Sequence, residues 1–204
     1  MYVPKMQNSS IQVGTDRQYH MKENSAHVFS MIARTFRKSS SCSIGGAHYG
    51  HTGSGSNHLC MPEEPIYDEV ETSTHADRAL LFSTEYQLNT GPSRMQPMHD
   101  QTPTCAVCRA PSGRTSKLMI PARNVCPSQE WRLEYAGYLM AEKYTTKRSE
   151  FVCVDREMVP KAGTQGNQGG GLLFMTEVRC LAGGGLDCGP YIDGYEITCA
   201  VCTI

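Results

Sequence analysis

The segment TCAVC occupies residues 104–108, and the same five residues return at 198–202, close to the C-terminus. The surrounding sequence repeats as well, since SNHLCMPEEP around Cys60 matches SEFVCVDREMVP around Cys153. A third segment, ALLFSTEYQ, returns as GLLFMTEVR. The offsets are nearly constant, at 93, 92 and 94 positions for Cys60 and Cys153, Leu81 and Leu173, and Cys105 and Cys199. Such self-similarity indicates two copies of one cysteine-containing unit.

The repeat divides the chain into three segments. A first unit is expected at residues 42–108 and a second at 109–204. Each is large enough for a small core but marginal without covalent cross-links. Residues 1–41 are polar, have no match in the second half, and are expected to be poorly ordered or outside the domain. Within them, the apolar spacing of HVFSMIARTF (27–36) is compatible with a short helix.

From Cys42 onward, short apolar or alternating runs are separated by Gly, Pro and Asn. Runs such as KLMIPA, WRLEYAGYLMAE, SEFVCVD, GLLFMTEVR and YEITCAVCTI are typical of strands. The segments GTQGNQGGG and AGGGLDCGP are typical of loops. The sequence therefore predicts an all-β protein with short helical turns, whose two disulfide-stapled units are related by a pseudo-twofold axis.

Composition and motifs exclude several functions. The net charge of −1 gives no electrostatic reason to expect nucleic acid or an anionic membrane as a partner. No apolar run approaches the roughly 18 residues that a membrane-spanning helix needs. The chain has no nucleophile elbow, phosphate loop or metalloprotease motif. We therefore expect a protein that is not an enzyme and carries no cofactor.

Three other residues have both a functional and a structural interpretation. Glu85 and Glu177 occupy the same position in the two copies. Two facing carboxylates could perform acid–base chemistry, but exposed positions of alternating strands are the favoured interpretation. Trp131, the only tryptophan, is expected to lie in the core.

The cysteines point to disulfides, because an even number at spaced positions is typical of proteins from an oxidising compartment. Two Cys-x-x-Cys pairs can bind zinc, but here they lie about 94 positions apart. Side chains at i and i+3 of an extended strand face opposite sides, so each cysteine would bond a different partner. A redox motif would need a following helix. We expect no metal and ten oxidised cysteines: Cys42, Cys60, Cys105, Cys108, Cys126, Cys153, Cys180, Cys188, Cys199 and Cys202.

Three histidines, His48, His51 and His58, fall in the glycine-rich segment GGAHYGHTGSGSNH. Three imidazoles in one loop could hold a metal ion. The second copy has no histidine at the matching place, so a polar surface loop is the favoured interpretation.

Several of these segments resemble one known family. GGAHYGHTGSGSNHLCMPEEP, CAVCRAP, LMIPAR, CP..W.LEYAGYLM, SEFVCVDRE and ITCAVCTI are similar to the C-terminal non-collagenous domain of sponge-type short-chain collagens and related invertebrate secreted proteins. More distantly, the tandem layout resembles the C-terminal domain of type IV collagen. The resemblance covers residues from about 42 to 204. It implies a secreted, non-catalytic extracellular matrix or recognition module that forms homo-oligomers and binds matrix proteins or glycans, with a lectin-like carbohydrate-binding protein as the alternative.

The chain departs from this family in two respects. No Gly-X-Y run precedes the domain, so this chain cannot form a collagen triple helix. In addition, Cys42 lies four residues before Gly46, whereas its expected counterpart Cys126 lies eleven before Gly137. The first unit is therefore expected to be truncated and to lack the strand that matches WRLEYA. The N-terminal segment MYVPKMQNSS also lacks the apolar core of a secretory signal, and we expect a leader that has been lost or replaced, or a different true start.

The resemblance also implies a pattern of disulfides. In the second unit, the type IV pattern implies the pairs Cys126–Cys202, Cys153–Cys199 and Cys180–Cys188. In the first unit, it implies Cys60–Cys105 and Cys42–Cys108.

Ligand binding is expected in loops, because the strand positions are committed to core and disulfides. Aromatic rings beside polar groups suit sugar or peptide contacts. The candidate ligand-binding residues are His48, Tyr49 and His51 in the first unit, and Tyr191, Asp193 and Tyr195 beside the last strand.

Overall fold

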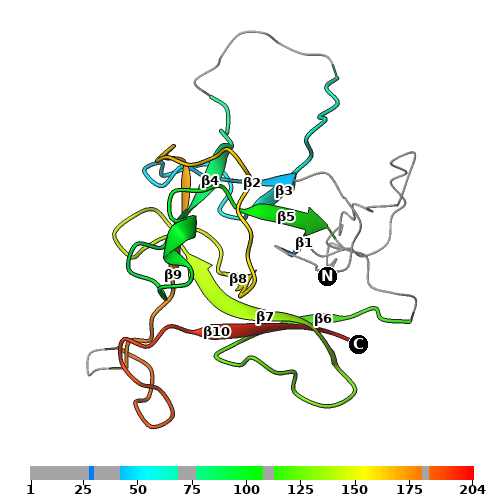
Figure 1. Ribbon diagram of the computed structural model, residues 1–204, viewed down its shortest axis with the longest axis vertical. Helices are drawn as coiled ribbons and strands as arrows, with labels where there is room; N and C mark the ends of the chain where they lie inside the picture. Colours follow the sequence, from blue (N-terminus) through cyan, green and yellow to red (C-terminus); the bar gives the residue numbers. More distant parts are fainter. Residues whose placement is uncertain (1–27, 30–41, 69–76, 108–112, 181–183) are drawn as a thin grey trace, which may run out of the picture.

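The computed structural model describes residues 28–29, 42–68, 77–107, 113–180 and 184–204. These residues form a curled ten-stranded sheet, and their only helical element is a 3-10 turn, η1 (Gln96–Met98) (Figure 1). The all-β prediction is therefore confirmed. The strands are β1 (Val28–Phe29), β2 (Cys42–Gly46), β3 (Leu59–Met61), β4 (Phe82–Gln87), β5 (Thr104–Val107), β6 (Lys117–Pro121), β7 (Arg132–Ala141), β8 (Val152–Asp155), β9 (Gly171–Met175) and β10 (Thr198–Thr203).

Strand pairing follows the same pattern in the two halves of the chain. In the first half, β2 pairs antiparallel with β3, β4 and β5, and β5 pairs with β1. In the second half, β7 pairs antiparallel with β8, β9 and β10, and β10 pairs with β6. The strand order is β1-β5-β2-β4-β9-β7-β10-β6. Its second four strands are the counterparts of the first four, taken in reverse order.

The register of these pairs also corresponds. Ile44 of β2 lies opposite Cys60, and Leu139 of β7 lies opposite Cys153. Both aliphatic residues are buried. The cysteines that the sequence repeat matched therefore lie opposite equivalent core residues.

The same register corrects one sequence-based assignment. Cys42 lies opposite Cys105, as Gly137 lies opposite Cys199. Cys42 therefore takes the place of Gly137 within a strand, and its predicted equivalence with Cys126 is wrong. The five residues of β2 correspond to the last five of the ten-residue β7.

Part of the N-terminal segment belongs to the sheet. Val28 and Phe29 lie opposite Val107 and Ala106 as strand β1, where a helix had been considered. Strand β5 offers a free edge there, and hydrogen bonding to that edge requires extended backbone. β6 occupies the same place beside β10. The rest of residues 1–41 lies outside the described residues.

The two halves meet through a parallel pair, β4 with β9. Gly170, with a φ of 110°, precedes β9, and a Cβ atom on it would overlap the carbonyl oxygen of Ser83. Glycine is needed there because the backbone before β9 approaches the backbone of β4 so closely. Leu173 lies opposite Tyr86, five positions beyond Leu81, its match in the sequence (86 − 81 = 5). A pure twofold axis between parallel strands would set matched residues side by side, so this pair does not follow the predicted pseudo-twofold axis.

The core is concentrated in the second half and at the junction. The largest cluster of buried residues comprises Tyr86, Leu88, Met95, Met140, Val154, Met158 and Leu173. A second comprises Tyr135, Leu139, Cys153, Cys199 and Val201, and a third only Ile44, Cys60 and Cys105. Trp131 is half-buried and belongs to none of them, because it precedes β7 in a turn closed by its N–H donating to the Ser128 carbonyl at 3.3 Å. Its prediction as a core residue is wrong.

Three of the expected disulfides are present: Cys60–Cys105, Cys126–Cys202 and Cys153–Cys199. Cys60–Cys105 and Cys153–Cys199 join equivalent strands, β3 to β5 and β8 to β10. These covalent links hold the small core of the first half and the larger core of the second.

The predicted Cys180–Cys188 disulfide is not formed, and both residues are free thiols. Cys180 is held in the loop by its N–H, which donates to the Asp193 carboxylate at 3.0 Å, and its sulfur lies 3.7 Å from the Tyr191 carbonyl oxygen. The Cys188 sulfur contacts the Cys180 carbonyl oxygen. Cys42 is also a free thiol, and its expected partner Cys108 lies outside the described residues. The expectation of ten oxidised cysteines is therefore wrong for Cys42, Cys180 and Cys188.

Candidate functional site

The two predicted groups of ligand-binding residues lie in different parts of the molecule. His48, Tyr49 and His51 belong to the loop between β2 and β3, in the upper part of Figure 1. Residues 191–195 belong to the loop before β10, at the bottom of the same view. The structure therefore does not bring the two groups into one site.

The first group forms a compact ring cluster. The His48 ring stacks on the rings of Tyr49 and His51, with centroid distances of 4.5 Å in both pairs. Both histidines also contact the Phe82 ring edge-on, at 5.0 and 5.3 Å. A turn closed by the His51 N–H on the His48 carbonyl, at 3.0 Å, brings the rings together. These three predicted residues thus share one surface.

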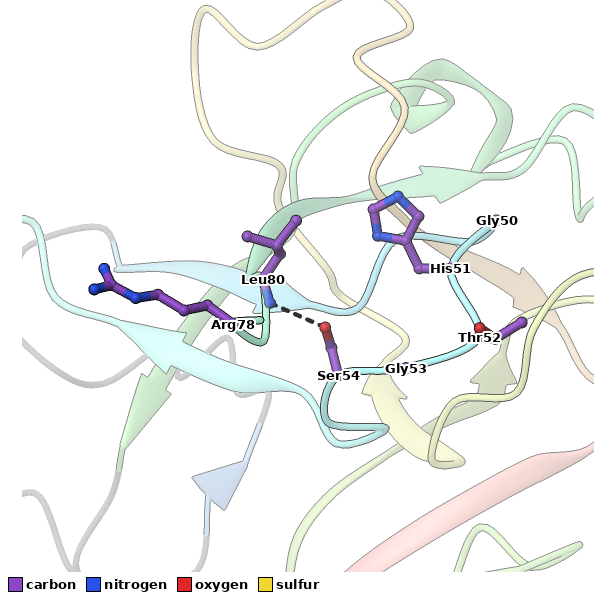
Figure 2. Close-up of a pocket in the computed structure, with 7 residues that line it drawn as sticks. All are labelled: Gly50, His51, Thr52, Gly53, Ser54, Arg78 and Leu80. Carbon is purple, nitrogen blue, oxygen red and sulfur yellow. Dashed lines mark hydrogen bonds between the residues drawn. The ribbon is translucent and has the colours of Figure 1, made fainter. Parts of the chain in front are cut away.

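An open hollow lies beside this cluster, with a volume of about 360 Å³. Figure 2 shows the loop from Gly50 to Ser54 along one side and the segment of Arg78 and Leu80 along the other. The Leu80 N–H donates to the Ser54 hydroxyl at 3.0 Å and joins the two sides. The hollow is lined by Gly50, His51, Thr52, Gly53, Ser54, Arg78 and Leu80.

Backbone hydrogen bonds to the second half hold this loop in place. The Tyr49 N–H donates to the Gly170 carbonyl at 2.8 Å, and the Tyr49 carbonyl accepts from the Lys147 N–H at 3.0 Å. The Glu150 N–H donates to the Ser56 carbonyl at 2.8 Å. The β2–β3 loop (residues 47–58) therefore lies beside the β7–β8 loop (residues 142–151), its counterpart in the second half.

The two loops carry corresponding side chains. The Lys143 ammonium lies 5.4 Å from the centre of the Phe174 ring, much as His48 lies against Phe82. Phe174 is opposite Ala141 in the sheet, and Phe82 is opposite Gly46. His48 lies two residues after Gly46, and Lys143 lies two residues after Ala141. The imidazole and the ammonium group therefore contact equivalent phenylalanine rings.

In the second half, a carboxylate accepts the N–H of Leu172, the residue that corresponds to Leu80 beside the hollow. Glu142 accepts hydrogen bonds from the Leu172 N–H at 2.7 Å and from the Thr146 hydroxyl at 2.8 Å. Desolvation by burial raises the pKa of Glu142, although these hydrogen bonds oppose the shift. The corresponding residue of the first half is Ala47, which directly follows β2 as Glu142 follows β7.

His58 differs from His48 and His51 because both nitrogen atoms of its ring are buried. Both of its ring nitrogens are buried without a hydrogen-bond partner, as is the Thr84 hydroxyl. Burial lowers the pKa of His58, which favours the neutral ring. Among the described residues, no group of three His, Cys, Asp or Glu side chains is placed to hold a metal ion. The three histidines of the glycine-rich segment thus do not form a metal site here, and His58 is more buried than a surface loop residue would be.

The second group of predicted residues is partly structural. The Asp193 carboxylate accepts from the Cys180 N–H at 3.0 Å and forms an ion pair with Arg179 at 3.1 Å. These contacts hold the loop closed, so Asp193 is not a free ligand-binding group. Tyr191 is half-buried, whereas Tyr195 is 61% exposed. Tyr195 is the member of this group with the most accessible ring.

The paired glutamates do not form an acid–base pair. Glu85 is 2% exposed, and its carboxylate accepts from the Gln168 N–H at 2.8 Å and from the Gln87 amide at 2.9 Å. Its prediction as an exposed residue is wrong, because loop residues around Gln168 cover that side of β4. Desolvation by burial raises the pKa of Glu85. Glu177 is exposed and forms a β-bridge with Glu196.

Sequence reasoning missed two polar residues that line the hollow, Ser54 and Arg78, and the half-buried carboxylate of Glu142. Ser54 and Arg78 are 24 positions apart (78 − 54 = 24) in segments without any motif. The one sequence difference that points to this site is Ala47 in place of Glu142. The two positions can be matched only when the register of β2 and β7 is known.

No family model, curated protein or solved structure matches this chain. The described residues contain no helix with the length and apolar character needed to cross a membrane.

Proposed function

We propose that this protein is a non-catalytic extracellular recognition and assembly module, which associates with further copies of itself or with other matrix components. The observation that carries the proposal is a rigid, disulfide-linked sheet with aromatic loops at its surface. Two disulfides join strands, and a third joins the loop between β6 and β7 to β10. Disulfides are typical of oxidising, extracellular surroundings.

The paired β2–β3 and β7–β8 loops are the proposed contact surface. They carry Tyr49, Tyr144 and Phe151, whose exposed fractions are 40%, 99% and 55%. Tyrosine rings provide large contact areas at a small cost in side-chain entropy and are enriched at interfaces. Hydrogen bonds between the loops, such as Lys147 N–H to the Tyr49 carbonyl, hold the surface in shape before a partner arrives, which lowers the ordering cost of binding.

Sedimentation velocity on oxidised protein tests assembly directly. We expect a concentration-dependent oligomer in the micromolar range, and at least about tenfold weaker association, or about 1.4 kcal/mol, for Tyr144→Ser. Tyr67→Ser, at an exposed tyrosine outside both loop groups, is the matched control. A protein that stays monomeric at every concentration and binds no matrix component would refute the assembly role.

A lectin-like carbohydrate-binding protein is the second candidate. It is supported by the hollow beside the ring cluster of His48, Tyr49 and His51, because aromatic rings next to polar groups suit saccharides. A glycan array with the oxidised protein tests it.

A further inference from the structure

We propose that the hollow beside Arg78 binds the carboxylate of an acidic saccharide, a hexuronate within an extracellular polysaccharide. The proposal rests on the recognition role proposed above and names the ligand class of that site.

The second half of the chain shows how this position holds a carboxylate. Glu142 lies directly after β7 and accepts the Leu172 N–H at 2.7 Å and the Thr146 hydroxyl at 2.8 Å. A carboxylate that accepts a backbone N–H and a hydroxyl in this way is held by two fixed donors. The protein thus builds a carboxylate site at the junction of this strand and this loop.

The first half has the same junction without the carboxylate. Leu80 corresponds to Leu172, since each lies two residues before its phenylalanine, Phe82 or Phe174. Ala47 replaces Glu142, and the Leu80 N–H donates to the Ser54 hydroxyl instead. The hollow of about 360 Å³ is lined by Leu80 and Ser54 and by no carboxylate of the described residues, so a carboxylate from another molecule can enter it.

Donors that suit an anion line this hollow. The Ser54 hydroxyl accepts from Leu80 at 3.0 Å, which leaves its own proton to donate to a ligand. Arg78 is exposed and forms no ion pair within the described part of the chain. In Figure 2 its side chain extends away from the loop of His51 to Ser54, and rotation about its side-chain bonds would bring the guanidinium toward a group bound in the hollow that Arg78 lines. Arginine binds carboxylates with two parallel hydrogen bonds, and among the described residues no Asp or Glu lines the hollow.

The surroundings favour a sugar as the carrier of that carboxylate. His51 lines the hollow and is stacked on His48, at a ring distance of 4.5 Å. The rings give a pyranose an apolar surface beside polar donors. The volume of about 360 Å³ lies at the small end of the range for ligand sites, about 300–1,000 Å³. One or two rings of an oligosaccharide are therefore the appropriate size.

Isothermal titration of the full oxidised chain with a hyaluronan hexasaccharide tests the proposal, because this sugar carries glucuronate and no sulfate. The same hexasaccharide with its carboxylates reduced to alcohols is the ligand control. We expect binding of the acid form and at least tenfold weaker binding of the reduced form. Equal binding of the two forms would overturn the proposal.

Two variants locate the site. Arg78→Gln should weaken binding of the acid form at least tenfold, whereas Arg123→Gln, which removes the same charge from another exposed position, should leave it unchanged. Ala47→Glu should abolish binding by supplying the carboxylate from within the chain, as Glu142 does. Far-ultraviolet circular dichroism and a thermal melt verify that each variant is folded. Binding that survives both Arg78→Gln and Ala47→Glu would place the sugar elsewhere and overturn the assignment.

Two further outcomes separate this proposal from the proposed function. Assembly by sedimentation without any binding of the hexasaccharide would refute the saccharide site and leave the assembly role standing. Tighter binding of an acidic peptide than of the hexasaccharide at the Arg78 hollow would assign the site to a protein partner and refute the saccharide.

Discussion

Removing the Cys153–Cys199 disulfide by the double substitution Cys153→Ala and Cys199→Ala should strongly destabilise the protein. The bridge joins β8 to β10 and closes a loop of 46 residues. In the chain-entropy description, a loop of that length stabilises the folded state by about 4 kcal/mol at 25 °C. Both cysteines are also buried, and a sulfur of roughly methylene size contributes about 0.8 kcal/mol on burial. We therefore expect a total loss of about 4 to 6 kcal/mol.

The first half provides a matched comparison. The Cys60–Cys105 bridge joins β3 to β5, the equivalent strands, with a sequence separation of 45. Its loop contribution is therefore also about 4 kcal/mol. Its surroundings differ, because among the residues whose burial is described its cluster contains only one other buried residue, Ile44. The Cys153–Cys199 bridge is packed among Tyr135, Leu139 and Val201. These side chains are less able to close the cavity that is left when the sulfur atoms are removed. Removing this bridge should cost about 1 kcal/mol more.

Equilibrium unfolding in urea measures both losses. With a slope of about 2 kcal/mol/M, a loss of 4 kcal/mol lowers the midpoint by about 2 M. Trp131 fluorescence and far-ultraviolet circular dichroism report the transition independently. Losses below about 1 kcal/mol for either pair would contradict the loop-closure argument. A larger loss for the Cys60–Cys105 pair would contradict the packing argument.

Three further predictions follow from single positions. Gly137→Ala should cost at least about 3 kcal/mol, because a Cβ atom there overlaps the Val154 carbonyl oxygen, whereas Gly189→Ala, with open space around it, should stay within about 0.5 kcal/mol in the same urea titration. Burial raises the pKa of Glu142 above its ordinary value of 4.5, so the folded state keeps a proton that the unfolded chain has released. Its contribution to stability is present below pH 4.5 and is lost as pH rises through the folded pKa. Glu142→Gln should therefore flatten the fall in stability as pH rises above 4.5, and an unchanged slope would contradict this. Among the described free thiols, exposed Cys188 should react first with a thiol reagent in the native protein, ahead of Cys180, whose pKa is raised by the Cys188 contact and by burial. Faster labelling of Cys180, located by peptide mass mapping, would show that the loop around Asp193 is not closed.

Much of the fold was accessible from the sequence because short alternating runs and glycine-rich breaks are local signals. The strand class follows from these signals, whereas the pairing of the three observed disulfides was implied only by the family resemblance, which stays a prediction. The cysteine repeat placed Cys60 and Cys153 on equivalent strands, which their opposite partners Ile44 and Leu139 bear out. A common origin of the two halves stays a prediction.

The errors came from contacts between segments far apart in the chain. Glu85 has the sequence pattern of an exposed strand residue, but the distant Gln168 loop covers it. Cys42 was aligned by its spacing to a glycine, whereas the sheet register aligns it with Gly137. The hollow at Arg78 depends on a residue that is missing, the counterpart of Glu142, and such an absence is visible only once the strands are paired.

The parallel pair of β4 and β9 has a consequence for synthesis of the protein. Thr84 and its partner Gly171 are 87 positions apart (171 − 84 = 87). Domains generally begin to fold from the N-terminus as they leave the ribosome, but here β4 has no neighbour on one side until β9 has been made. During that interval the strand has unpaired N–H and C=O groups on one edge, and such an edge attracts other chains. Chains that end before residue 171 should therefore accumulate as aggregates or be degraded rather than persist as a separately folded first half.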